Sequence, residues 1–296
     1  MITRFRGALN KLKYFSRYCV KYSTRIMEAH LTKPDGHGDD VVVVAAHPTT
    51  TPLMTEDTGK IFEKAICDAY GTPYDGPFQY SQAEVDKLTP RLKRLVTDNL
   101  FPMCVHTASK GARYDFTAVA EFGLHLSAKS NKKKGGKIAP QVVGQATPQK
   151  FWEECVKFSN CSNENGVPDP ATLKKYIQEN IAAIMPMLWR YTFDSPIVYY
   201  VRDTDQIRFI APTAAAAVAT GPDWTSFQYS WSRSYDKWTN STSLRVVAPG
   251  GGDGGGGDTT IMEFQFHTKS RQNMAVRWCI DKVLHVFAGH FKVTEL

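Results

Sequence analysis

The order of apolar and polar residues predicts a chain that mixes helices and strands at first and becomes rich in strands later. Residues 41–46 form an apolar run of mostly β-branched residues bounded by turn residues, which is typical of a buried strand. A helix is predicted from the acidic pair at residues 56–57 to residue 70, just before a glycine. Ser81, with Glu84 three residues later, predicts the start of another helix.

Shorter segments continue this pattern through the rest of the chain. Strands are predicted at residues 113–119 and 123–130, followed by a basic, glycine-containing loop at 131–137 and helices at 147–158 and 168–188. Further strands are predicted at 197–202, 206–210, 226–230, 244–247 and 261–268. A last helix is predicted near 274–284, and the glycine tract 249–258 is predicted to be a surface turn. The fold class is therefore α/β, with a β-rich C-terminal part.

The charge of the chain is concentrated at its beginning. The formal net charge is +7, and residues 1–27 contain seven Lys and Arg but no acidic residue. The rest of the chain is neutral, which excludes a uniformly basic nucleic-acid-binding body. Three explanations of this basic arm stay open: a mitochondrial presequence, an amphipathic arm that binds a polyanion, and an upstream extension before a second start at Met27.

Composition narrows the class of protein further. No apolar run approaches the roughly 18 residues that span a bilayer, so we expect no membrane insertion. The six cysteines are scattered without a Cys-x-x-Cys pair, and no apolar secretory signal is visible. We therefore expect reduced thiols and a cytoplasmic protein, or a mitochondrial one if residues 1–27 are a presequence. No phosphate-binding glycine loop is found, and we expect no organic cofactor.

The segment from residue 112 to residue 145 concentrates the residues that can carry chemistry. Asp115 lies on a predicted strand, and Ser127-Ala128-Lys129 follows twelve residues later on the next one. In that second strand His125, Ser127 and Lys129 share one face, while apolar residues share the other. An acid and a lysine on neighbouring strands suit phosphodiester hydrolysis, in which a carboxylate holds Mg²⁺ and a lysine offsets the charge of the transition state.

These residues resemble the PD-(D/E)xK nucleases, and among them the type II restriction endonucleases. Those enzymes place an Asp about ten to twenty residues before an acid-x-Lys triplet. The loop from Gly135 to Gln145 and the earlier helix pattern Gly59-x-x-Phe62-Glu63 are also similar. The resemblance covers about residues 55–160 and implies a mixed central sheet flanked by helices.

This chain departs from the family pattern at the first position of the triplet, where Ser127 replaces the usual acid. Some restriction enzymes resemble this Ser-x-Lys form and supply the carboxylate from elsewhere. Glu63 and Glu121 are the two candidates for completing the metal site with Asp115, and Glu153 is a weaker one. If none of them reaches the metal, the core is a degenerate nuclease that only binds.

Several groups of polar residues are candidates for contacting DNA. Lys132, Lys133, Lys134 and Lys137 could clamp phosphates, and Gln141 and Gln145 would face the substrate from the following helix. Near the C-terminus, the candidates for base or phosphate contacts are Gln265, His267, Lys269, Arg271, Asn273 and Arg277. The same region offers a second candidate triplet, Glu263-x-Gln265, with Asp258 as its partner acid.

The resemblance implies a Mg²⁺-dependent, site-specific endonuclease that cuts double-stranded DNA in a bacterial or viral-host cytoplasm. Asp115, Ser127 and Lys129 would form its catalytic group, and a homodimer is expected if the target is palindromic. We expect an arm and linker at 1–40, a nuclease core at 41–190 and a β-rich recognition part with the last helix at 191–296, packed as one domain. The alternatives are a non-catalytic nucleic-acid-binding or viral structural protein with a degenerate nuclease core, and a repair or recombination nuclease.

Overall fold

The structure is a computed structural model that describes residues 55–108, 112–158, 166–213, 221–247, 258–267 and 273–296. Residues Pro52–Leu296 form one compact unit. The basic arm and the strand predicted at 41–46 lie outside the described residues, as does the glycine tract apart from Asp258.

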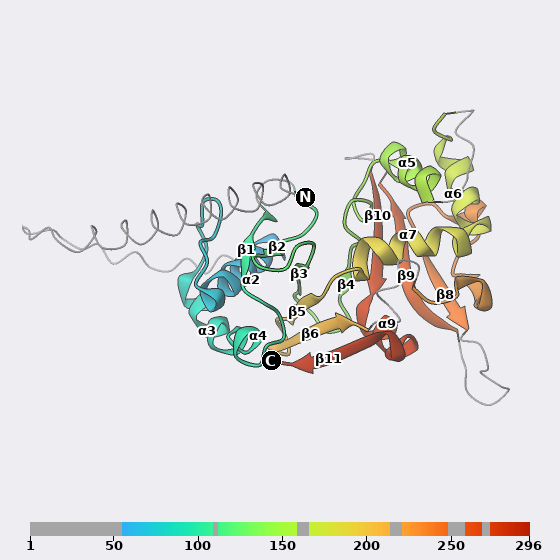
Figure 1. The fold of residues 1–296 in the computed structure, drawn as a ribbon. Coiled ribbons are helices and arrows are strands. Elements are labelled where there is room, and N and C mark those ends of the chain that lie inside the picture. The colour runs from blue at the N-terminus through green and yellow to red at the C-terminus, as the bar shows by residue number, and fades with distance from the viewer. Residues whose placement is uncertain (1–54, 109–111, 159–165, 214–220, 248–257, 268–272) are drawn as a thin grey trace, which may run out of the picture. The chain divides into compact units, whose positions relative to one another are not determined.

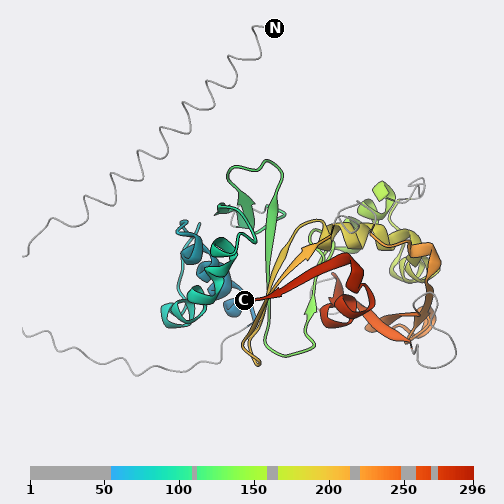
Figure 2. The same cartoon turned by 60° about the horizontal axis from the view of Figure 1, so that its bottom comes forward.

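Helices come before the first described strand, and two of them match the predictions. Helix α2 spans Thr55–Tyr70, α3 spans Gln82–Leu92 and the short α4 spans Arg94–Thr97. The Oγ of Ser81 accepts a hydrogen bond from the backbone N–H of Glu84 at 3.4 Å, so the predicted N-cap of α3 is confirmed. All three helices pack on one side of the first sheet (Figures 1 and 2).

The first sheet is mixed, as the resemblance implied. Its six strands follow the order β1-β2-β3-β5-β6-β11. Their bounds are Cys104–His106, Phe116–Ala118, His125–Asn131, Ile197–Val201, Gln206–Pro212 and Phe291–Glu295. Strands β3 and β5 are parallel, and every other neighbouring pair is antiparallel. Parallel neighbours need a long crossover, and here helices supply it.

The crossover between β3 and β5 contains α5 at Pro148–Phe158, α6 at Pro170–Glu179 and α7 at Ile181–Phe193. The prediction of one helix over 168–188 is therefore wrong, because the helix is interrupted at Asn180. Asn180 leaves the helical conformation, with φ −117° and ψ 21°, and its side-chain Nδ2 donates to the carbonyl of Tyr176 at 3.0 Å. Asparagine competes in this way for backbone groups and favours helix ends over helix interiors. None of the helices in the described ranges is long and apolar enough to cross a bilayer.

The second sheet is antiparallel and has the order β4-β10-β9-β8-β7. The strands, in chain order, are Lys137–Ile138, Gln228–Trp231, Ser241–Val247, Thr259–Phe266 and Met274–Cys279. The helix predicted at 274–284 is wrong in its first half, where β10 pairs with β9 from Met274↔Phe266 to Trp278↔Met262. Helix α9 covers only Ile280–Val286. A short apolar run is compatible with a helix or with a strand, and here pairing with β9 makes it a strand.

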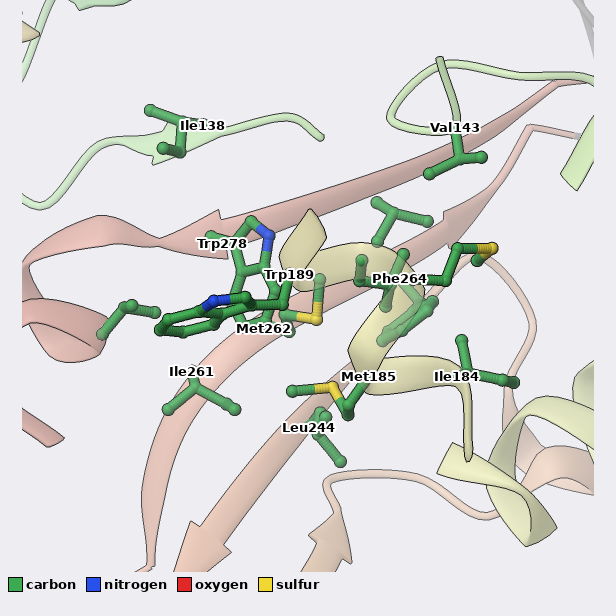
Figure 3. Packing of buried hydrophobic residues seen from close by; sticks show 14 of the residues in the cluster. Ile138, Val143, Ile184, Met185, Trp189, Leu244, Ile261, Met262, Phe264 and Trp278 are labelled. Carbon is green, nitrogen blue, oxygen red and sulfur yellow. The ribbon is translucent and has the colours of Figure 1, made fainter. Parts of the chain in front are cut away.

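Strand β5 separates two hydrophobic cores because its side chains alternate between the two faces of the first sheet. Val198 and Tyr200 join the cluster formed with α2, α3 and α4. Ile197, Tyr199 and Val201 join the larger cluster, which also contains α7 and the second sheet. In this larger core, Trp189 and Met185 of α7 lie among strand residues such as Met262 and Trp278 (Figure 3).

Candidate active site

Asp115 and Lys129 meet at the neighbouring strands β2 and β3. The register pairs Phe116 with Leu126, which brings Asp115 beside the middle of β3. The Oδ2 atom of Asp115 accepts a hydrogen bond from the backbone N–H of Ala128 at 2.7 Å and lies 3.9 Å from the Nζ of Lys129. Both side chains keep limited access to solvent, at 20% for Asp115 and 24% for Lys129. The fold thus brings together the acid and the lysine of the sequence pattern.

The surroundings of Asp115 oppose its negative charge. Burial raises the pKa of its carboxyl, the ammonium of Lys129 offsets part of this rise, and the negative charge of Glu63 raises the pKa again. A carboxylate in this position gains stability from any additional cation. The electrostatics of Asp115 are therefore those of a group suited to hold a cation.

Glu63 on α2 is the acid that accompanies Asp115. Its Oε2 atom lies 3.1 Å from the Nζ of Lys60 and 3.4 Å from the Nε2 of His106. Burial alone would raise the pKa of Glu63, but the hydrogen bond from His106 and the nearby Lys60 outweigh it and lower the pKa. Glu63 is therefore ionised near neutral pH.

Glu121 lies away from this group. It is exposed in the turn between β2 and β3, and its carbonyl accepts the backbone N–H of Leu124 at 3.2 Å. Asp115 is at the other end of β2 from this turn. Of the two acids suggested by the sequence, the geometry favours Glu63. Glu153 on α5 accepts a hydrogen bond from Gln149 at 3.1 Å.

Ser127 is fully buried, and its Oγ accepts a hydrogen bond from the Nε2 of Gln141 at 2.5 Å. Gln141 in turn accepts from the Nε of Arg113 at 3.0 Å. The predicted polar face of β3 therefore continues into a side-chain network. The opposite face carries Leu126 in the core with α2, as predicted.

Gln141 and Gln145 do not lie on the following helix, so this part of the prediction is wrong. Both belong to the turn that precedes α5, which starts only at Pro148. The carbonyl of Gly144 accepts the backbone N–H of Val276 at 2.9 Å, which ties this segment to β10. Gln145 is exposed. Backbone hydrogen bonds to β10 therefore hold this segment as a turn, and the helix begins only after it.

Asp194, just after α7, anchors the residues that precede Asp115. Its Oδ2 atom accepts hydrogen bonds from a terminal nitrogen of Arg113 and from the hydroxyl of Tyr114, both at 2.7 Å. Tyr114 also stacks on His125 of β3, with ring centroids 4.1 Å apart. These contacts fix the strand start from which Asp115 projects.

The lysine loop after β3 is held at its backbone and exposed at two of its side chains. The N–H of Lys134 donates to Asp203 at 2.9 Å, and the N–H of Asp203 donates to the carbonyl of Lys132 at 3.0 Å. Lys133 and Lys134 are exposed, and Lys132 is half-buried. The loop therefore presents ammonium groups from a fixed backbone.

Lys137, Glu263 and Arg277 meet on the half-buried face of the second sheet. The Nζ of Lys137 lies 2.8 Å from the Oε2 of Glu263. Glu263 on β9 is directly opposite Arg277 on β10 in the strand register. Burial would raise the pKa of Glu263, but Lys137, Gln265 and Arg277 lower it. The partner acid of the second candidate triplet, Asp258, accepts a hydrogen bond from Ser230 at 2.7 Å.

The remaining candidates for DNA contacts lie around the end of β9. His267 is exposed, and its backbone N–H donates to the carbonyl of Asn273 at 2.9 Å. Lys269 and Arg271 lie outside the described residues.

A metal would have to be held by few protein ligands. Within the described ranges, no three His, Cys, Asp or Glu side chains gather as a metal site. Mg²⁺ commonly uses only one or two carboxylates and completes its shell with waters and substrate phosphates. The half-buried Asp115, with the charge of Glu63 acting on it, fits that mode of binding.

Comparison with known proteins supports the resemblance seen in the sequence. The chain is 36% identical over 244 residues to the type II restriction enzyme CviAII of Paramecium bursaria Chlorella virus 1. The aligned region covers 82% of this chain and 64% of that enzyme, so the chain spans less than two thirds of its relative. No protein-family model and no solved structure matches the chain. The predicted resemblance to type II restriction endonucleases is thus confirmed over most of this chain.

Proposed function

We propose that this protein is a Mg²⁺-dependent, site-specific endonuclease of double-stranded DNA with a PD-(D/E)xK core. The observation that carries the proposal is the meeting of Asp115 and Lys129, 3.9 Å apart, with Glu63 acting on Asp115. The similarity to a type II restriction enzyme supports DNA as the substrate. The mixed sheet, with helices on its flanks, is compatible with such a core.

Each residue of the group has a distinct task in this proposal. Asp115 and Glu63 would hold Mg²⁺, which when bound polarises the scissile phosphate and activates a water molecule. Lys129 would orient the attacking water and offset the extra negative charge of the transition state. Ser127, through Gln141, would keep β3 in register with the segment that carries Asp115.

DNA would be held by cations outside this group. The exposed Lys133 and Lys134 are placed to contact phosphates, with Lys132 beside them. The half-buried face of the second sheet, with Arg277, Gln265 and Lys137, would contact bases or phosphates. Asn273, His267 and Gln145, together with Lys269 and Arg271, remain proposed contacts. A homodimer would match a palindromic target, and light scattering would measure it.

The decisive experiment is to incubate plasmid and phage DNA with the protein and Mg²⁺. We expect discrete fragments from the unmodified protein and a loss of rate of about 100-fold or more in Lys129→Ala. Lys292→Ala removes an exposed lysine from β11 and should cut normally. Both variants should still bind duplex DNA in a mobility-shift assay.

The other outcomes decide between the alternatives. A smear, or a preference for branched DNA, would favour a repair or recombination nuclease. DNA binding without cleavage in Mg²⁺ or Mn²⁺ would favour a degenerate core that only binds. Full activity in Lys129→Ala would refute the proposed catalytic group.

A further inference from the structure

His106 carries a proton on a defined nitrogen because of its backbone neighbour. The N–H of Asp75 points to the Nδ1 of His106 at 3.2 Å. A backbone N–H can only donate, so Nδ1 must be the acceptor and carries no proton. In the neutral ring the proton is therefore on Nε2, which lies 3.4 Å from the Oε2 of Glu63. The imidazole is thus a hydrogen-bond donor to this carboxylate.

The ring of His106 has little freedom to turn away. Its side chain is only 1% exposed, on the edge strand β1. It stacks on Tyr74 with ring centroids 4.7 Å apart, and it lies 5.2 Å from the ring of Phe116 on β2. The donor is thus held by a loop and two strands, all separate from the helix that carries Glu63.

Lys60 and His106 both reach the same oxygen of Glu63. Lys60 and His106 contact Oε2, and no described residue donates to Oε1. The side chain of Lys60 is 36% exposed and lies one turn away on the same helix, so it constrains the carboxylate weakly. The buried imidazole is the contact that sets the orientation of the carboxylate, and among the described residues it leaves Oε1 without a donor.

We propose that His106 is a positioning residue that orients Glu63 for metal binding, with its tautomer set by the backbone of Asp75. This inference rests on the proposed function, in which Glu63 and Asp115 hold the metal. Residues that donate to a metal-binding side chain commonly change metal affinity 10- to 100-fold when they are removed. His106 has no direct part in the chemistry.

Calorimetric titration of Mn²⁺ into the full, metal-free protein tests this role without relying on cleavage. His106→Gln keeps an amide N–H near the position of Nε2, whereas His106→Asn is too short to reach Glu63. We expect His106→Asn to weaken Mn²⁺ binding about 10- to 100-fold and His106→Gln to stay within a few-fold of the unmodified protein. His106→Phe, which keeps an aromatic ring but no donor, should behave like His106→Asn. Circular dichroism melts report whether each variant is folded.

Glu63→Gln and Asp115→Asn distinguish a failure of the positioning role from a failure of the proposed active site. In a Glu63→Gln background, His106→Asn should cause no additional loss of affinity, because the oriented carboxylate is already gone. If Asp115→Asn weakens Mn²⁺ binding but folded His106→Asn and His106→Phe do not, the positioning role is overturned and the proposed active site stands. Equal losses in His106→Gln and His106→Asn would also overturn it. If Asp115→Asn has no effect or the protein binds no Mn²⁺, the proposed active site fails, and the positioning role fails with it.

Discussion

At the scale of single residues, Glu154 shows how a buried charge makes stability depend on pH. Its carboxylate on α5 lies 2.8 Å from Lys150 and 2.7 Å from Lys157, and it accepts the hydroxyl of Tyr191 at 2.5 Å. Burial would raise the pKa of Glu154, but these three partners outweigh it and lower the pKa to about 2. The folded state therefore favours the ionised carboxylate.

The sign of the effect follows from the lowered pKa. We expect Glu154→Gln to reduce the free energy of unfolding by about 1–2 kcal/mol at pH 7, a figure that allows for solvent around the two lysines. The difference should shrink as the pH falls below the ordinary pKa of 4.5 and disappear below the folded value of about 2. Urea unfolding at several pH values measures it. Glu153→Gln is the control, and a difference that does not change with pH would contradict the assignment.

Residue patterns predicted which side chains come together only where sequence spacing alone sets the geometry. The alternation along residues 123–130 placed Lys129 on the polar face of β3, and the adjacent hairpin strand brought Asp115 to it. His106 could not be found this way, because its partners Glu63 and Asp75 are 43 and 31 residues away in the chain. Such long-range contacts depend on how α2 packs on the sheet, which no local pattern contains.

At the scale of elements, local periodicity predicted the helices with clear ends and failed where pairing decided the structure. The prediction for α2 was confirmed, and α3 began at its capping serine. Residues 274–279 have an apolar pattern that suits a helix, yet β9 offers a partner edge and they form β10. Strands β1 and β11 went unpredicted, because β1 has only three residues and β11 is mostly exposed, with Phe291 its one buried residue.

The second sheet leads to a prediction about DNA binding. Arg277 lies on its half-buried face, opposite Glu263 on the neighbouring strand. We expect Arg277→Ala to weaken binding to duplex DNA and to reduce the slope of log affinity against log salt by about 1 if it contacts a phosphate. If it contacts a base, the loss should appear only for the preferred sequence. Fluorescence anisotropy at several salt concentrations distinguishes these results. Lys292→Ala is the matched control, and equal losses in the two variants would refute a specific contact.

At the scale of the whole molecule, strand β5 joins two hydrophobic cores into one structure. Its alternating side chains supply Val198 and Tyr200 to one core and Ile197 and Tyr199 to the other. The sequence predicted β5 as a strand but not its double role, because a strand with two buried faces shows no alternation of apolar and polar residues. A shared central strand should make the two cores unfold together.

The tryptophans make this coupling measurable. All six lie in or against the larger core, and none lies in the core with α2. Ile66 on α2 is fully buried, and Ile66→Ala should lower the free energy of unfolding by about 2–5 kcal/mol. Because β5 is common to both cores, tryptophan fluorescence and far-ultraviolet circular dichroism should shift to the same lower urea midpoint. Val276→Ala, in the larger core, should move both signals in the same way. A fluorescence midpoint left unchanged by Ile66→Ala would mean that the cores unfold separately and that β5 does not couple them.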